Sequence, residues 1–248
     1  DITAMEMTKW FDTNYHFIVP EFKANQKFCF FSKKIIHEFQ EAKREGFNAK
    51  PVLLGPVSYL LLGKEKEEGF HRLELIKNLF PVYLEVLKEL DDANAHYIQF
   101  DEPCLSLNLT DAERNVFVKV YNDIKKAFPH LHIILTTYFE CYGDNLQMVL
   151  HLPIQTLHLD LVRCPNQLDD ILETDISKSK LNLSLGVIEG RNIWKNDFTN
   201  SLELINKAKK AIGTDRIMIA PSCSLLHVPC DLDLETDEKN LPSEIKNW

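Results

Sequence analysis

The sequence predicts an α/β fold, a (β/α)8 TIM-type barrel whose amino-terminal strand or strands lie outside this chain. Apolar, extended-looking runs alternate with helical patterns along the chain. The runs are apolar on both faces, as in strands that helices cover on either side. Successive runs start about 24 to 46 residues apart, which suits strand–helix units.

Six short apolar runs are predicted to be strands. In chain order they cover residues 51–55, 97–101, 132–136, 156–160, 183–186 and 217–220. A seventh, less regular extended segment covers residues 7–13. A closed barrel of this class has eight strands, so we expect its first unit or units to lie upstream of Asp1. An open doubly wound sheet is the alternative, but no Gly-rich strand-to-helix turn supports dinucleotide binding.

Helical patterns separate these runs. Residues 71–90 carry apolar side chains near the i, i+3, i+4 rhythm, and residues 112–128 and 201–212 repeat it. Thr110 and Asp111 are suitable cap residues for the helix at 112–128. The chain has no low-complexity segment, no Pro/Gly/Ser linker and only 8 Gly. We therefore expect residues 1–248 to form most of one barrel domain.

The composition excludes several classes of function. With 37 acidic and 28 basic residues the formal net charge is -9, whereas nucleic-acid and anionic-membrane binding need a basic face. No apolar run approaches the roughly 20 residues of a membrane span, and the first residues do not resemble a signal peptide. The six cysteines form no CxxC pair. We expect mostly reduced thiols and a cytoplasmic location.

Polar side chains collect where the predicted strands end, which is the rim where barrels of this class place functional groups. The predicted rim residues are Asp101, Glu102, Asp160 and Arg191. Carboxylates and an Arg at one rim can bind charged ligands or move protons. The alternative is structural, because strand-end carboxylates also cap helices or pair with an Arg. His158 stands between two leucines, which favours a core histidine over a ligand.

We expect no metal site in this chain. A catalytic zinc needs about three protein ligands, and the candidates are Cys223, His227, Cys141 and Glu140. The third predicted strand ends at residues 136–138 in Thr-Thr-Tyr, which are poor zinc ligands. Zinc binding at this rim is therefore not predicted.

Residues 5–16 combine aromatic side chains, amides and one lysine, Lys9. Such a mixture suits the recognition of a flat, charged ligand. The alternative is a buried strand in which Trp10, Phe11 and Tyr15 fill the core.

Seven segments together resemble the amino-terminal barrel of the cobalamin-independent methionine synthase family, the 5-methyltetrahydropteroyltriglutamate–homocysteine methyltransferases. They occur in the order and at the spacing of that family over nearly the whole chain. The segments are EMTKWFDTNYH at 6–16, KPVLLGP at 50–56, QFDEP at 99–103, LTTYFE at 135–140, HLDLV at 158–162, GRNIW at 190–194 and SCSLLH at 222–227.

The resemblance implies a parent enzyme of two face-to-face barrels, which transfers the methyl group of 5-methyltetrahydrofolate polyglutamate to homocysteine to form methionine. Its zinc, held by a His, two Cys and a Glu, belongs to the carboxyl-terminal barrel, which this chain lacks. No catalytic residue is therefore expected in this fragment, which alone is expected to be inactive. Cys223 looks like a remnant of a thiolate position in the sister barrel.

The same resemblance implies what this part contributes. Lys9 stands where the family's MTKWF motif binds the folate polyglutamate, and the domain would support the zinc barrel, its partner. A non-catalytic folate-binding or scaffold module is the alternative function. A third hypothesis is an independent barrel enzyme that uses Asp101, Glu102 and Asp160.

Overall fold

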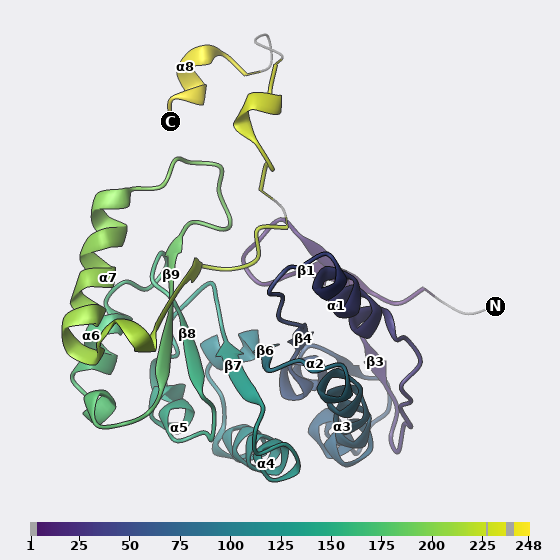
Figure 1. Cartoon of the computed structure of the whole chain (residues 1–248). Helices are drawn as coiled ribbons and strands as arrows, with labels where there is room; N and C mark the ends of the chain where they lie inside the picture. The colour runs from purple at the N-terminus through teal and green to yellow at the C-terminus, as the bar shows by residue number, and fades with distance from the viewer. Residues whose placement is uncertain (1–3, 227, 237–240) are drawn as a thin grey trace. The chain divides into compact units, whose positions relative to one another are not determined.

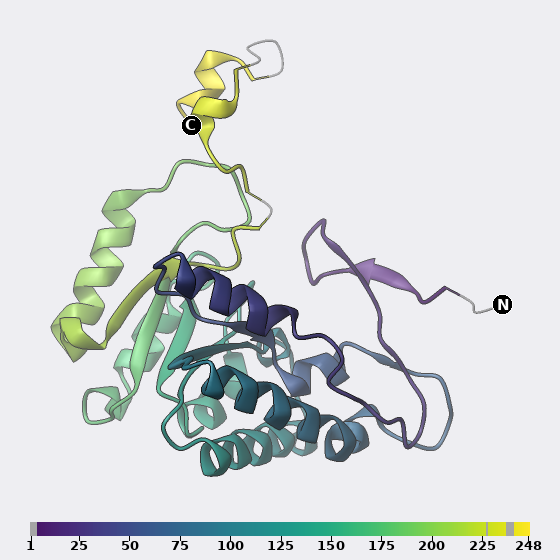
Figure 2. The same ribbon diagram turned by 45° about the vertical axis from the view of Figure 1, so that its right-hand side comes forward.

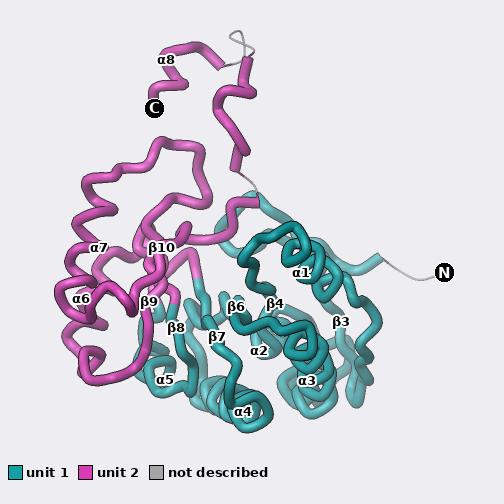
Figure 3. Tube along the Cα trace, in the orientation of Figure 1, with its two compact units in different colours: residues 1–137, 142–157 teal, residues 138–141, 158–248 magenta. Residues whose placement is uncertain are grey.

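The structure is a computed structural model that describes residues 4–226, 228–236 and 241–248. Contacts divide the chain into two compact units, coloured separately in Figure 3. Unit 1 comprises residues 1–137 and 142–157, and unit 2 comprises residues 138–141 and 158–248. Strand β8 (Thr156–Asp160) gives its first two residues to unit 1 and its last three to unit 2. That residues 1–248 behave as one domain stays a prediction.

Unit 1 contains parallel strands in the order β4-β6-β7, followed by the start of β8. These strands are β4 (Val52–Leu54), β6 (Tyr97–Asp101) and β7 (His132–Thr136). The α-helices of this unit are α1 (Lys34–Arg44), α2 (Pro56–Leu61), α3 (Ile76–Asp92), α4 (Asp111–Ala127) and α5 (Leu146–Leu150).

The apolar pattern of the sequence explains how unit 1 packs. Phe100 on β6 and Leu87 on α3 are fully buried, and so is Phe117 on α4. Removing such side chains from water is the main stabilising contribution to the fold, at roughly 1.5–3 kcal/mol each. The predicted cap is confirmed at Thr110, whose hydroxyl accepts from the N–H of Glu113 in a capping box.

The predicted seventh strand at residues 7–13 is confirmed only for Met7–Lys9, and it does not belong to the parallel sheet. The chain there forms an antiparallel hairpin of β1 (Met7–Lys9) and β2 (His16–Ile18). Figure 2 shows this hairpin, in purple, as an extension from the rest of unit 1. A strand of the parallel sheet would be buried on both faces, whereas all three residues of β1 are exposed. The next two short strands, β3 (Glu21–Phe22) and β5 (Lys64–Glu65), pair in parallel with each other.

Unit 2 contains the end of β8 and two further parallel strands, β9 (Asn182–Ile188) and β10 (Ile217–Pro221). Its α-helices are α6 (Gln167–Leu172), α7 (Phe198–Ile212) and α8 (Ser243–Lys246). Figure 1 shows α7 alongside β9, and the buried Ala208 and Leu185 come from these two elements. Asp197 caps α7 by accepting from the N–H groups of Thr199 and Asn200.

The predicted alternation of parallel strands and helices is confirmed, and with it the α/β fold of a partial (β/α)8-type barrel. The strands β6, β7 and β8 begin and end where the sequence places them. The predicted helix at residues 71–90 begins with a 3-10 turn, Arg72–Leu75, before α3. Within the described residues, no helix is both long enough and apolar enough to cross a membrane.

Candidate functional site

The predicted site residues lie in separate places of the two units. Lys9 belongs to the β1–β2 hairpin, and Asp101 and Glu102 follow one another at the end of β6, all in unit 1. Asp160 ends β8 and Arg191 follows β9, both in unit 2. The hairpin is a sheet of its own, so Lys9 and the β6 carboxylates sit on different sheets.

The hairpin presents Lys9 to solvent. Its cross-strand partner in the register is His16, which is also exposed. Directly opposed residues of an antiparallel pair project from the same face, so the two nitrogen-bearing side chains share one side of the hairpin.

The turn of this hairpin is tightly hydrogen-bonded. The Trp10 N–H donates to the Tyr15 carbonyl at 2.7 Å, and the Thr13 hydroxyl donates to the Trp10 carbonyl at 2.6 Å. Trp10 also packs edge-on against Phe11 and Phe17. The aromatic residues thus stabilise the hairpin that positions Lys9, while Trp10 and Phe11 remain partly exposed.

Glu102 is completely buried at the end of β6. One carboxylate oxygen accepts the N–H of Ser58, in the first turn of α2, at 2.7 Å. The other accepts the hydroxyl of Tyr121, from α4, at 3.1 Å. The carboxylate therefore links the β6 end to two helices of unit 1 and satisfies one of the N–H groups that a helix start leaves unpaired.

Gly55 makes room for this carboxylate. A Cβ atom at Gly55 would lie 1.9 Å from the Glu102 carboxyl carbon, which no real contact allows. The backbone of Gly55 has φ −67° and ψ 147°, which any residue can adopt. Glycine is therefore required here for space and not for backbone conformation.

Burial raises the pKa of the Glu102 carboxyl to about 7, against the opposing hydrogen bonds from Ser58, Tyr121 and the Val57 N–H. The neighbouring Cys104 thiol has its pKa raised to about 12, chiefly by burial. Burial and the Glu102 charge also raise the pKa of Tyr121. Glu102 can therefore hold a proton near neutral pH, but with no exposed surface its carboxyl cannot touch a ligand in this conformation.

Asp101 is only partly buried and points to a different set of partners. The Gln99 amide donates to its carboxylate at 2.7 Å, and the Lys50 ammonium donates to the same Gln99 side chain. Burial lowers the pKa of Lys50, and the charge of Asp101 opposes this. The group is a polar chain across β4 and β6.

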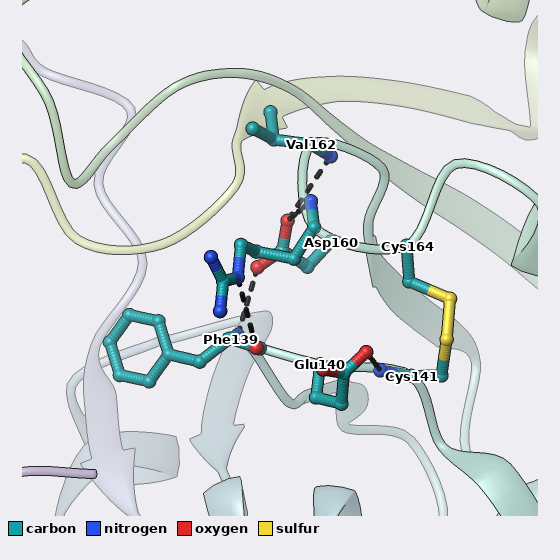
Figure 4. The surroundings of a disulfide bond; sticks show 7 residues. Phe139, Glu140, Cys141, Asp160, Val162 and Cys164 are labelled. Atoms are coloured by element: carbon teal, nitrogen blue, oxygen red, sulfur yellow. Dashed lines mark hydrogen bonds between the residues drawn. A yellow bond between two sulfur atoms is a disulfide. The ribbon is translucent and has the colours of Figure 1, made fainter. Parts of the chain in front are cut away.

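Asp160, at the end of β8, is fully buried and is held by backbone groups (Figure 4). One oxygen accepts the N–H of Phe139 at 2.8 Å, and the other accepts those of Val162 at 3.2 Å and Arg163 at 2.9 Å. Burial raises the pKa of the Asp160 carboxyl despite these donors, and Glu189 adds to the rise. The side chain thus joins the loop after β7 to the turn after β8, within unit 2.

Phe139, in this loop, has a positive φ of 75°, a strained conformation for a residue with a bulky side chain. The Arg191 guanidinium carbon lies 5.3 Å from the centre of its ring, within the range of a cation–π contact. The Arg191 N–H donates to the Glu189 carboxylate at 3.0 Å. Arg191 is therefore positioned beside the loop that Asp160 fixes.

His158 is a core histidine, as predicted. Its side chain is 4% exposed, and its ring nitrogens contact the Ser184 hydroxyl at 3.0 Å and the Ser222 carbonyl at 3.1 Å. Because a carbonyl only accepts, the nitrogen facing Ser222 carries the proton.

Cys223 and its neighbours form no ligand set within the described residues. Burial raises the pKa of the Cys223 thiol to about 11, so it is a neutral thiol at physiological pH and a poor nucleophile. The Gly190 backbone is packed against it, since a Cβ there would lie 2.8 Å from the sulfur. His227, the other predicted candidate on this segment, lies outside the described residues.

Two of the predicted zinc candidates do meet a third donor, which the sequence reasoning missed. Glu140, Cys141 and Cys164 bring their ligand atoms within 4.8 Å of one another. Cys141 and Cys164 form a disulfide with Cα atoms 5.4 Å apart (Figure 4), whereas Cys29, Cys104, Cys223 and Cys230 are free. The expectation of reduced thiols therefore does not hold for this pair.

A sequence signal for this pairing exists. Cys141 lies five residues after the end of β7, and Cys164 lies four residues after the end of β8. Residues at similar offsets beyond adjacent parallel strands come close together. The partners of Glu102 carry no comparable signal, because Ser58 is 44 positions before it and Tyr121 is 19 positions after it.

Comparison with known proteins identifies the family that the chain matches. Residues 1–213 match the family described as "Cobalamin-independent synthase, N-terminal domain". A 5-methyltetrahydropteroyltriglutamate–homocysteine methyltransferase of Flavobacterium johnsoniae is 65% identical over 248 residues, and one of Cytophaga hutchinsonii is 59% identical over 249. Both alignments cover the whole chain but 32% of the relative, so the chain spans about a third of their length.

Solved structures resemble the chain in fold. A putative vitamin-B12-independent methionine synthase of Listeria monocytogenes aligns with a TM-score of 0.62 at 16% identity, over 82% of this chain and 67% of that one. A B12-independent methionine synthase of Shewanella sp. W3-18-1, solved with selenomethionine, aligns with a TM-score of 0.61 at 16% identity, over 89% and 67%.

Proposed function

Because residues 1–213 match the N-terminal domain of the cobalamin-independent synthases, the chain belongs to that family, and we propose that it is part of a methyltransferase that makes methionine. The substrates of the proposed parent enzyme are 5-methyltetrahydrofolate polyglutamate and homocysteine. The observation that carries the proposal is 65% identity along the entire chain to a methyltransferase of Flavobacterium johnsoniae. A cytoplasmic location is part of the proposal, since folate and homocysteine are metabolites of that compartment.

The contribution of this chain is to bind folate and to support the partner barrel. Lys9 and His16 lie opposite each other on the exposed hairpin. An ammonium group can serve as a point-charge partner for a polyglutamate carboxylate, and an imidazole N–H beside it can donate a hydrogen bond to the same ligand. The partly exposed rings of Trp10 and Phe11 offer an apolar contact next to Lys9.

The chemical step belongs to residues outside this chain. In the proposed enzyme a zinc ion, bound by residues outside this chain, would lower the pKa of the homocysteine thiol. The end of β7 supplies Thr136, Thr137 and Tyr138, and these side chains do not fit a zinc ion.

Glu102 and Asp160 have a positioning role in this proposal. Both carboxylates are fully buried, and their hydrogen bonds go to helix and loop N–H groups or to Tyr121. They set the shape of the strand ends without touching substrate. Asp101 and Arg191 are the more accessible of the predicted rim residues and remain candidates for ligand contact.

The first experiment separates the proposed function from its alternatives. The 248-residue chain, supplied with homocysteine, 5-methyltetrahydrofolate triglutamate and Zn²⁺, is expected to form no methionine. A chimera of this chain with the remaining two thirds of the Flavobacterium johnsoniae relative is expected to form methionine at a rate near that of the relative. Turnover by the chain alone would support an independent barrel enzyme, and an inactive, folded chimera would support a scaffold module.

The second experiment concerns Lys9. In the active chimera, Lys9→Met is expected to raise the KM for the triglutamate substrate by about two- to five-fold and to leave kcat unchanged, because an exposed ion pair contributes about 0–1 kcal/mol. The KM for the monoglutamate should not change. Lys34→Met is the matched control, since Lys34 is also exposed in unit 1 but pairs with Glu38 on its own helix. Equal effects of both substitutions would reject a specific role for Lys9.

A further inference from the structure

Three potential metal ligands converge at the loops that follow β7 and β8. Glu140 and Cys141 come from the first loop and Cys164 from the second, and their donor atoms lie within 4.8 Å of one another. Two Zn–S bonds of about 2.3 Å place thiolate sulfurs at most about 4.6 Å apart. In the disulfide the two sulfurs lie closer than that, so after reduction they need to separate only as far as two Zn–S bonds span.

The two loops are held together by more than the disulfide. The buried Asp160 carboxylate accepts the N–H of Phe139 on one loop and that of Arg163 on the other. The Arg163 side chain donates in turn to the Phe139 carbonyl, and the Cys164 N–H donates to the Asp160 carbonyl at 3.0 Å. Opening the sulfur–sulfur bond removes none of these bonds, so the reduced donors stay close. At metal sites, hydrogen bonds around the ligands hold the donor atoms in position in the same way.

The donor set selects a class of cation. Two thiolates and one carboxylate suit Zn²⁺ and other thiophilic divalent ions, whereas Mg²⁺ and Ca²⁺ require oxygen ligands throughout. Three negative donors exceed the charge of a divalent ion by one, so the site disfavours further anions. Glu140 is exposed and Cys141 is half-buried, which leaves an entry path and a fourth position open to water.

We propose that Glu140, Cys141 and Cys164, once the disulfide is reduced, form a binding site for a thiophilic divalent cation such as Zn²⁺. A dithiol reductant supplies two electrons and two protons, the Cys141–Cys164 bond breaks, and the reductant becomes a disulfide. Zn²⁺ then forms two Zn–S bonds, and the two thiol protons pass to solvent. Oxidation and metal binding exclude each other, because both use the same two sulfurs. The proposal is independent of the proposed methyl transfer.

The test uses the full 248-residue chain, reduced with a phosphine under anaerobic conditions. Titration with Zn²⁺ against a chromophoric chelator is expected to show one equivalent bound per chain. Co²⁺ in its place should give sulfur-to-metal charge-transfer bands and the visible bands of a tetrahedral site. The oxidised chain, identified by a mass two hydrogens lower, is expected to bind neither ion at this site.

Variants locate the site. Substituting a residue that only hydrogen-bonds to a metal ligand typically weakens metal binding by about 10–100-fold. Loss of a ligand itself should have at least that effect, so Cys141→Ser and Cys164→Ser should each weaken Zn²⁺ binding by that factor or more. Glu140→Gln should weaken it by about ten-fold. The matched control is the double variant Cys29→Ser/Cys230→Ser, which removes two exposed free thiols and should bind like the parent. Circular dichroism of each variant confirms that the fold is retained.

A measurement without substitutions guards against misfolded variants. Bound Zn²⁺ should protect Cys141 and Cys164 from alkylation in the reduced parent chain, as peptide mass mapping would show. The proposal is overturned by a reduced chain that takes up no Zn²⁺, or by protection at other cysteines instead. Undiminished binding in the Cys141→Ser variant would overturn it as well.

Discussion

Two fully buried carboxylates, Glu102 in unit 1 and Asp160 in unit 2, end their strands in different surroundings. Asp160 is held by three backbone N–H groups, two of which come from the next three residues. Glu102 is held by the N–H groups of Val57 and Ser58 and by the hydroxyls of Ser58 and Tyr121, all from distant segments. A hydroxyl can reorient when its partner changes protonation state, whereas a backbone N–H can only donate.

This difference concerns protonation as much as geometry. Burial raises the pKa of both carboxyls. In the Glu102 pocket a neutral acid can be accommodated because the Tyr121 hydroxyl can also accept. Around Asp160 the three hydrogen-bonding partners are backbone N–H donors, so a proton on this carboxyl would find no acceptor among them. We infer that Glu102 is the carboxyl whose titration affects the stability of the fold near neutral pH, whereas the backbone donors around Asp160 favour its charged form.

The contrast between the Glu102 and Asp160 carboxyls is wrong if the stability of the chain does not depend on the titration of Glu102. The folded-state pKa of about 7 lies above the ordinary value of 4.5 for this carboxyl, so the folded state binds the proton more tightly than the unfolded state. Stability is therefore highest below pH 4.5 for this group and falls as pH rises toward 7. The expected loss is about 3 kcal/mol.

Urea unfolding of the parent and of Glu102→Gln between pH 4.5 and 8 measures this loss. The parent is expected to lose about 3 kcal/mol relative to the variant across that window. Taking the difference removes the titration of other groups. Parallel curves for the two proteins would mean that folding does not raise the pKa of Glu102 and that the inferred contrast with Asp160 is wrong.

Gly55→Ala tests how closely the Glu102 pocket is packed. The added Cβ would meet the carboxyl carbon at 1.9 Å, so the buried side chain must shift, at a cost of about 2–3 kcal/mol in the free energy of unfolding. Gly46→Ala is the control, because Gly46 has open space around it and a φ of 83°. The control should lose only about 1 kcal/mol, for the left-handed backbone alone. Equal losses would show that the carboxylate has room to move.

Asp160→Asn sharpens the comparison from the side of unit 2. The amide retains one acceptor oxygen but turns its NH2 group toward N–H donors, which leaves a buried donor unpaired. The expected loss is about 2 kcal/mol in the free energy of unfolding, together with faster proteolysis in the loop that contains Phe139. Thr174→Val, in the same unit, removes a hydroxyl that donates to the Ile171 carbonyl and should cost about 1 kcal/mol or less. If Asp160→Asn lost no more free energy of unfolding than Thr174→Val, the three backbone N–H groups would not be holding the Asp160 carboxylate as described.

Tyr121→Phe should have the smallest effect. It removes one hydrogen bond to Glu102, at about 1 kcal/mol near pH 8, where the carboxylate is ionised. Because that bond favours the charged form, its loss should raise the Glu102 pKa further, so the fall in stability still begins near pH 4.5 but extends to higher pH. Infrared detection of the buried carboxyl during a pH titration would follow this shift directly. A lower pKa in the variant would disprove the assigned contact.

The sequence alone predicted the alternation of strands and helices, the bounds of β6, β7 and β8, and the cap at Thr110. These features are local: apolar periodicity and cap chemistry depend on residues a few positions apart. The extended segment at residues 7–13 could not be assigned to the right sheet, because extended residues next to a turn look the same in a hairpin as in a barrel strand. Only the exposure of all of β1 distinguishes the two.

The family and the strand ends that carry polar groups could therefore be stated from the sequence, because short motifs in register specify them. What the polar groups do was decided by the tertiary structure. Glu102 meets Ser58 and Tyr121, and Cys141 meets Cys164, only after parallel strands bring distant segments together. Burial sets the pKa of a carboxyl and the availability of a thiol. It depends on how the whole chain packs, so residues that are neighbours in the sequence do not predict it.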